Sequence, residues 1–143
     1  MTIEQLSIFV ENYSGRLADV ADVIGGAGIN MHAMSIADTA DFGILRAIVS
    51  DSRQAKEALS SAGYVVTVTP VVAAAIQDTP GGLAKVLRIL ADADISIEYI
   101  YAFITRRKGD AYVVFRVADN ERAAAVFAEN GIRTISARDI DEL

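Results

Sequence analysis

Apolar and polar residues alternate with two different periods at the start of the chain. Residues 6–10 are apolar at every second position, which predicts a β-strand. Residues 17–24 carry apolar side chains at the spacing i, i+3, i+4 and i+7, which is typical of an amphipathic helix. The chain therefore begins with a strand and a helix, and Gly28 is placed to end that helix.

The segment after this helix predicts two strands, a second helix and a last strand. Residues 30–38 and 44–49 favour a hairpin around the polar turn at 39–43. Apolar positions in residues 55–62 predict a helix, and the Val- and Thr-rich residues 64–69 predict a strand. The predicted order of elements is βαββαβ.

The whole pattern then repeats. Residues 14–20 (SGRLADV) recur as residues 80–86 (PGGLAKV), a shift of 66 positions, and residues 49–51 (VSD) recur as residues 117–119 (VAD), a shift of 68. The two extra residues fit most simply into the polar turn at 106–109. Each half of the chain is therefore one copy of the same unit.

Two copies of this order predict an α+β fold. We expect two ferredoxin-like βαββαβ units side by side, each with an antiparallel sheet that carries both helices on one face. A single proline separates the copies, so the expected domains are residues 1–69 and 70–143. Such a short connection disfavours independent domains on a flexible tether.

One predicted strand, residues 97–104, is apolar on both faces. Strict alternation places Ile97, Tyr99 and Tyr101 on one face and further apolar residues on the other. Because the helices cover only one face of the sheet, the other face needs a partner. We expect it to pack on the same face of another subunit, which gives a homodimer.

Composition excludes several classes of function. The chain of 143 residues is 52% hydrophobic with a formal net charge of −6, so neither nucleic acid nor a membrane surface is an expected partner. There is no cysteine, and His32 is the single histidine, which favours a structural role for His32. Without a basic leader or a membrane-length apolar segment, we expect a cytoplasmic protein that uses no metal or cofactor.

The turn between the first strand and first helix of each copy carries the most informative chemistry. These turns are residues 11–17 (ENYSGRL) and 77–83 (QDTPGGL). The first N–H groups of a helix lack intrahelical partners and the helix dipole adds positive potential, so the turn suits a carboxylate. Asn12 and Asn30 offer an acceptor for an ammonium and a further donor to the carboxylate.

Helix capping is the simpler interpretation of the same residues. Ser14, Asp78 and Thr79 are favoured N-cap residues, and Pro80 suits a first helical turn. On periodicity alone, capping without any ligand is favoured, and the residue that caps each helix stays open.

These turns also resemble a known family. Residues 12–17 (NYSGRL) and 78–83 (DTPGGL) are similar to the N/D-x-P-G-x-L turn of ACT domains, and residues 27–30 (AGIN) resemble their A-G-I-N helix ending. The resemblance covers the whole chain as two copies, as in stand-alone double-ACT proteins without a catalytic domain. It implies regulatory domains that bind amino acids at interfaces between paired domains and control enzymes of amino-acid metabolism.

The resemblance implies where the ligand binds. Asn12 and Asn30 match ligand-contact positions in the first copy, where Ser14 replaces the usual proline, and Asp78 and Ser96 stand at the same positions in the second copy. A negative charge at Asp78 repels a carboxylate, so the two sites need not be equivalent. Tyr99 suits a core or a subunit interface more simply than a ligand contact. The predicted ligand-binding residues are Asn12, Tyr13, Ser14, Gly15, Arg16, Leu17, Asn30, Met31, Asp78, Pro80, Gly81, Leu83, Ser96 and Tyr99.

We therefore expect a sensor of free amino acids and not an enzyme. The main alternative is a ligand-free interaction or regulatory subunit of an amino-acid-metabolism enzyme. An acylphosphatase-type enzyme shares the βαββαβ order, and Arg16 with Asn12 or Asn30 supplies the residue types, but the surrounding motif differs. RNA binding on the open sheet face lacks both the aromatic pattern and the basic charge.

Overall fold

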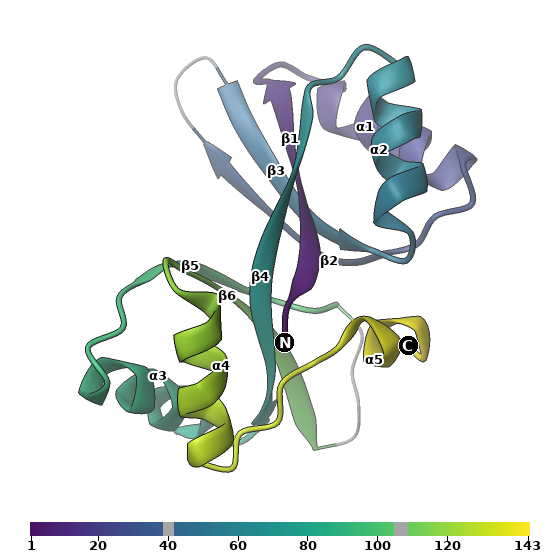
Figure 1. The fold of residues 1–143 in the computed structure, drawn as a ribbon. Helices are drawn as coiled ribbons and strands as arrows, with labels where there is room; N and C mark the ends of the chain where they lie inside the picture. The colour runs from purple at the N-terminus through teal and green to yellow at the C-terminus, as the bar shows by residue number, and fades with distance from the viewer. Residues whose placement is uncertain (39–41, 105–108) are drawn as a thin grey trace. The chain divides into compact units, whose positions relative to one another are not determined.

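The computed structural model describes residues 1–38, 42–104 and 109–143. Most of the predicted turns at 39–43 and 106–109 lies outside the described residues. The elements follow one another along the chain (Figure 1) as β1 (Ile3–Glu11), α1 (Arg16–Gly26), β2 (Met31–Asp38), β3 (Phe42–Val49), α2 (Ser52–Ser61), β4 (Val66–Gln77), α3 (Gly82–Asp92), β5 (Ile97–Ala102), β6 (Asp110–Val117), α4 (Asn120–Glu129) and α5 (Ala137–Asp141). The α+β fold, with βαββαβ twice, is confirmed.

The chain divides into two compact units, and its strands pair in the order β2-β3-β1-β4-β6-β5. The N-terminal unit is Glu4–Thr69, and the C-terminal unit is Pro70–Leu143 together with Met1–Ile3. Strand β4 runs through the division at Thr69 and Pro70 without a break. Within the described residues no helix is long and apolar enough to cross a membrane.

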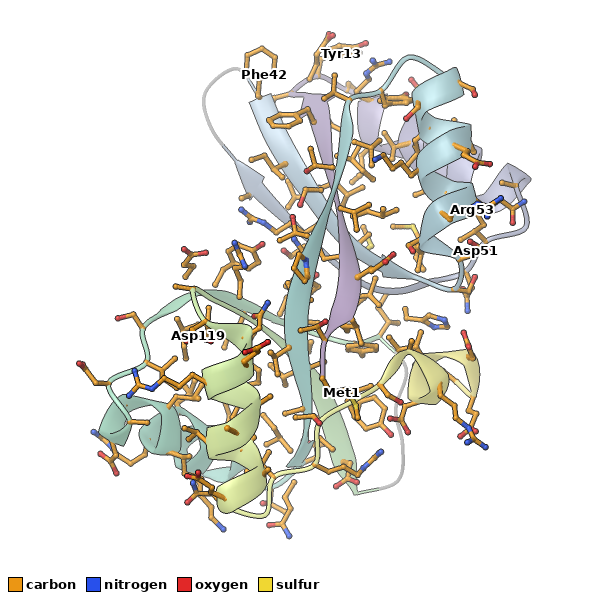
Figure 2. All side chains as sticks on the ribbon, viewed as in Figure 1. Met1, Tyr13, Phe42, Asp51, Arg53 and Asp119 are labelled. Atoms are coloured by element: carbon orange, nitrogen blue, oxygen red, sulfur yellow. The ribbon has the colours of Figure 1, made fainter. Side chains whose placement is uncertain are left out.

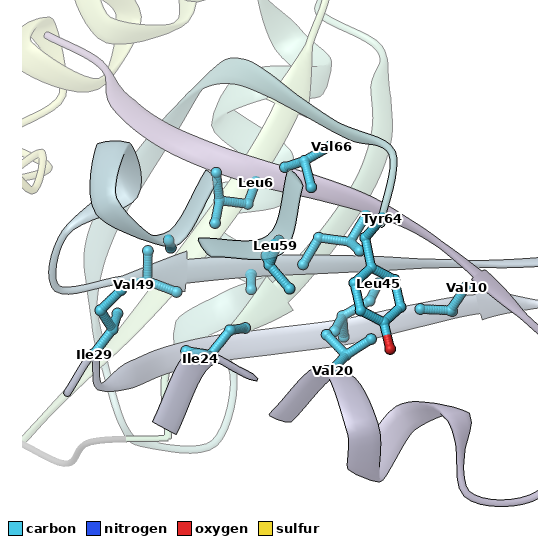
Figure 3. Close-up of a cluster of buried hydrophobic side chains, with 13 residues drawn as sticks. Leu6, Val10, Val20, Ile24, Ile29, Leu45, Val49, Leu59, Tyr64 and Val66 are labelled. Carbon is cyan, nitrogen blue, oxygen red and sulfur yellow. The ribbon is translucent and has the colours of Figure 1, made fainter. Parts of the chain in front are cut away.

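In the N-terminal unit, α1 and α2 share one face of the sheet. The alternation predicted for residues 6–10 holds, because Leu6, Ile8 and Val10 are buried on that face and pair with β3. Their side chains meet the apolar side of both helices, as Figure 3 shows. This core consists of Leu6, Ile8, Val10, Val20, Ile24, Ile29, Leu45, Ala47, Val49, Ala55, Leu59, Tyr64 and Val66.

The C-terminal unit repeats this plan with a shorter last strand. Helices α3 and α4 cover one core, in which the rings of Phe115 and Phe127 lie 5.4 Å apart. The last strand is reduced to a bridge between Thr134 and Ala74. The chain then forms α5, which the sequence pattern did not predict because it spans only five residues.

A β-bulge changes which residues of β5 face the core. Ile97 pairs with Val117 but Tyr99 pairs with Arg116, so one extra residue lies between them. The bulge reverses the alternation, and Ile97 packs against the helix-side core together with Ile100. The prediction that Ile97 and Tyr99 share a face is therefore wrong. Strand β2 has a similar shift between Met31 and Ala33.

Candidate functional site

The turns before α1 and α3 share one backbone feature. Gly15 and Gly81 occupy the N-cap positions in the left-handed conformation, with φ of 87° and 84°. Neither helix has a side-chain cap among the described residues. The expectation that Ser14, Asp78 or Thr79 caps a helix is therefore wrong. Side chains cap from an extended N-cap residue, and a glycine in a left-handed turn holds that place here.

Both turns also make the same backbone hydrogen bonds. The N–H of Tyr13 donates to the carbonyl of Glu11 over 3.0 Å, and the N–H of Thr79 donates to that of Gln77 over 2.9 Å. The first N–H of each helix also donates within its turn, from Arg16 to the Tyr13 carbonyl over 3.3 Å and from Gly82 to the Thr79 carbonyl over 3.0 Å. In both copies the next N–H groups of the first helical turn are the candidate donors to a carboxylate.

A small cavity adjoins the turn of the N-terminal unit, and Arg16 is one of its lining residues. The Arg16 guanidinium carbon lies 4.5 Å from the centre of the Tyr64 ring and 5.8 Å from that of Tyr13. Its Nε is buried and has no hydrogen-bond partner among the described residues. The cavity measures about 150 Å³ and is lined by Phe9, Glu11, Arg16, Phe42, Gly63, Tyr64 and Val65.

A larger cavity adjoins the turn of the C-terminal unit. It measures about 370 Å³ and is lined by Ala75, Ile76, Gln77, Gly82, Lys85, Val86, Asp110, Asn130, Gly131, Ile132 and Arg133. Gly82 begins α3 as Arg16 begins α1. A Cβ atom on Gly82 would lie 2.1 Å from the carbonyl oxygen of Gln77, so only glycine fits this backbone. Gly82 therefore adds no side chain to the cavity lining.

Three charged residues line the larger cavity, and one of them, Arg133, already interacts with other side chains. Arg133 forms an ion pair with Asp139 (Nη1 to Oδ1, 3.0 Å) and donates a hydrogen bond to the Tyr112 hydroxyl over 2.9 Å. Lys85 and Asp110 take part in none of the ion pairs between described residues. The cavity lining therefore includes one cation and one anion outside these ion pairs, Lys85 and Asp110, together with Arg133, whose charge is paired with Asp139.

Asp139 links α5 to the segment before it. The backbone N–H and hydroxyl of Ser136 each donate to its carboxylate over 2.8 Å, and Arg133 adds an ion pair. The hydrogen bonds from Ser136, assisted by Arg133, lower the pKa of Asp139 below its usual value. Reciprocally, the N–H of Asp139 donates to the Ser136 hydroxyl over 3.2 Å, which completes a capping box.

The predicted residues of the first copy lie at both ends of α1. Asn12, Tyr13, Ser14, Gly15 and Leu17 are exposed around the turn at its start. Beyond its other end, the N–H of Asn30 donates to the Ser50 hydroxyl over 3.0 Å, and Met31 packs against the core. Helix α1 has 11 residues, or about 16 Å at 1.5 Å per residue. Asn12 and Asn30 of one unit are therefore not brought together.

The second copy separates its predicted residues in the same way. Four of them are exposed around the turn before α3: Asp78, Pro80, Gly81 and Leu83. Ser96 is exposed beyond the far end of α3, and Tyr99 in β5 stacks on Tyr101 with ring centres 6.4 Å apart. Within the unit, the structure does not gather these residues into one site.

The residues that line the two cavities were largely missed by the motif. Tyr64 follows α2, and Asp110 begins β6. Neither residue is therefore close in sequence to the turns at residues 11–17 and 77–83. Lys85 gave a usable signal, because it lies three residues after Gly82 and therefore on the same side of α3. The replacement of Arg16 by Gly82 between the copies was also visible in the repeat.

This architecture matches the model of an ACT domain pair over residues 1–143. The chain therefore belongs to the ACT-domain family, whose members are regulatory domains that bind small molecules. Comparison with curated proteins gives no match.

Several solved structures resemble the chain. Protein BT0572 from Bacteroides thetaiotaomicron is 40% identical with a TM-score of 0.92, and the match covers 100% of this chain and 98% of that one. The ligand-free regulatory subunit of aspartate kinase from Thermus thermophilus is 18% identical with a TM-score of 0.65, covering 88% and 90%. The corresponding subunit from Thermus flavus is 18% identical with a TM-score of 0.61, also covering 88% and 90%. At 18% identity, the two aspartate kinase subunits show a shared fold.

Proposed function

We propose that the chain is a non-catalytic, cytoplasmic sensor of a free amino acid, built from ACT domains at residues 1–69 and 70–143. The observation that carries this proposal is the pair of helix starts capped by left-handed glycines without a side-chain cap. Such a start leaves N–H donors and the positive end of the helix dipole for a ligand carboxylate. The family provides the ligand class, because ACT domains bind amino acids and regulate enzymes.

The proposed contacts come from both ends of the first helix in each domain. They are Asn12, Tyr13, Ser14, Gly15, Arg16, Leu17, Asn30 and Met31 in the first domain and Asp78, Pro80, Gly81, Leu83, Ser96 and Tyr99 in the second. The turn holds the carboxylate, and the amide oxygens of Asn12 and Asn30 accept hydrogen bonds from the ammonium. The first domain is the better site, because Asp78 places a negative charge where Asn12 stands in the other copy.

The separation of Asn12 from Asn30 within one unit favours a site shared between paired domains. A homodimer supplies the second domain, and exposed apolar side chains lie near the turn that needs it. Phe42 is 55% exposed and Val65 is 62% exposed, and Figure 2 shows Phe42 at the same end of the unit as Tyr13. Phe42 and Val65 also line the same small cavity, and this pair of residues, the apolar patch, is the proposed dimer contact.

The regulated partner is proposed to be an enzyme of amino-acid metabolism. Solved structures with this fold include regulatory subunits of aspartate kinase, which supports a separate regulatory chain as a workable arrangement. The ligand shifts the geometry or assembly of the dimer, and a coupling of about 1–3 kcal/mol is typical of such control.

Isothermal titration of the full chain with each of the twenty amino acids tests the proposal. We expect heat of binding with at least one of them, and Asn12→Ala to weaken that binding about tenfold, because a hydrogen bond to a charged group is lost. Ser61→Ala, an exposed residue at the end of α2, is the matched control and leaves binding unchanged. If no amino acid binds, a ligand-free interaction subunit replaces the sensor.

A further inference from the structure

The two cavities occupy the same place in the two copies of the repeat. Gly63 and Tyr64 line the N-terminal cavity, and their counterparts, Gly131 and Ile132, line the C-terminal one. Both cavities lie between the start of the first helix and the segment that follows the second helix. They are therefore corresponding features of the two copies.

The first difference is volume. In the N-terminal unit, Arg16 lies over the Tyr64 ring at 4.5 Å, and the remaining cavity measures about 150 Å³. In the C-terminal unit, Gly82 has no side chain to place there, and the cavity measures about 370 Å³. Ligand pockets begin at about 300 Å³, so the C-terminal cavity has the size of a small-molecule site.

The second difference is charge. Lys85 and Asp110 line the C-terminal cavity, whereas the matching positions of the first copy hold Asp19 and Phe42. Asp110 pairs with Gln77 across the sheet, and Lys85 lies one turn into α3, so both groups stand close to the turn. Between them the lining includes the apolar residues Ile76, Val86 and Ile132.

We propose that the C-terminal cavity binds a small zwitterion of α-amino-acid type within a single unit. Lys85 pairs with the carboxylate, Asp110 pairs with the ammonium, and the apolar lining receives the side chain. The site needs no second domain, so it is separate from the contacts shared between paired domains. Its counterpart in the N-terminal unit is smaller, at about 150 Å³, and has Arg16 in its lining.

Titration followed by ¹H–¹⁵N NMR on the full chain tests this site with each of the twenty amino acids as probe. The amides of Gly131 and Ile132 report on the cavity wall, and neither belongs to the proposed shared site. We expect at least one amino acid to shift both amides. The shifts persist in Asn12→Ala.

Two charge variants and two matched controls complete the test. Lys85→Gln and Asp110→Asn each weaken binding at the cavity about tenfold, because each removes one charged partner. Lys56→Gln on α2 and Asp92→Asn at the end of α3 remove the same charges from exposed positions and leave binding unchanged. The cavity site is overturned if no amino acid shifts Gly131 and Ile132, if both charge variants bind normally, or if Asn12→Ala abolishes the shifts. If Asn12→Ala abolishes the shifts, they come from the shared site, and only the proposal of a separate cavity site fails.

Discussion

Gly82 and Gly81 stand next to each other, but substitution by alanine should harm the protein for different reasons. Gly81 has a φ of 84° and open space around its missing Cβ, so Gly81→Ala costs only the left-handed backbone, about 1–2 kcal/mol. A Cβ on Gly82 would lie 2.1 Å from the Gln77 carbonyl oxygen and 3.2 Å from its carbon. That obstacle is backbone at the end of a buried strand, so the strand end or helix start must move.

Overpacking against well-ordered structure costs about 1–3 kcal/mol, occasionally more, and a contact this short belongs at the upper end. We therefore expect Gly82→Ala to lower the free energy of unfolding by about 3 kcal/mol or more. Arg16→Ala is the matched control, because the first copy already carries a Cβ at this position. It should lose only the contact of the guanidinium with the Tyr64 ring, about 0.5–2 kcal/mol.

Urea unfolding followed by far-UV circular dichroism measures all three variants against the wild type. The expected order of destabilisation is Gly82→Ala first, with Gly81→Ala and Arg16→Ala clearly smaller. An equal or smaller effect of Gly82→Ala than of Gly81→Ala would refute the close approach of α3 to β4, and with it the shape of the C-terminal cavity.

Three further measurements test the fold, the C-terminal helix and the apolar patch. Phe127→Ala removes a fully buried ring that packs on Phe115 and should cost about 3–5 kcal/mol in urea unfolding, and a loss below about 1 kcal/mol contradicts the packing. The folded pKa of Asp139 lies below its ordinary value of 3.8, so its contribution to stability is complete above that value and is lost as the pH falls through the lowered pKa. Asp139→Asn should flatten this acid-side slope of the unfolding free energy, and an unchanged slope argues against the capping box. Phe42→Asp should weaken self-association in analytical ultracentrifugation, whereas an unaltered mass excludes this patch from the dimer interface.

Hydrophobic periodicity was sufficient to predict the architecture. The helices of both copies follow the 3.6-residue period closely, and the glycine-containing turns recur at shifts of 66 and 68 positions. Two features escaped the pattern for identifiable reasons. The bulge beside Tyr99 reverses the alternation of β5 without any glycine or proline to signal it. The five-residue helix α5 is too short for a periodic signal, and the capping box of Ser136 and Asp139 was its only local mark.

The candidate site was predicted less completely than the fold. The motif indicates the turn, because glycine and small polar residues are needed there for local reasons. It does not indicate the cavity beside the turn, whose walls come from segments about fifty residues apart in sequence, such as Gly82 and Gly131. Proximity of that kind follows from tertiary packing. The comparison of Arg16 with Gly82 shows that a repeat can still reveal where the sequences of the two copies differ beside a cavity.

The central claim is that this ACT domain pair recognises a free amino acid, and differential scanning fluorimetry of the full chain with each of the twenty amino acids tests it most directly. A ligand at about 100 times its Kd stabilises the folded state by about 2.7 kcal/mol, which raises Tm by about 5–10 °C for a chain of this length. We predict such a rise with at least one amino acid and no rise with the matching amine or carboxylic acid alone. An unchanged Tm across all twenty would contradict the claim.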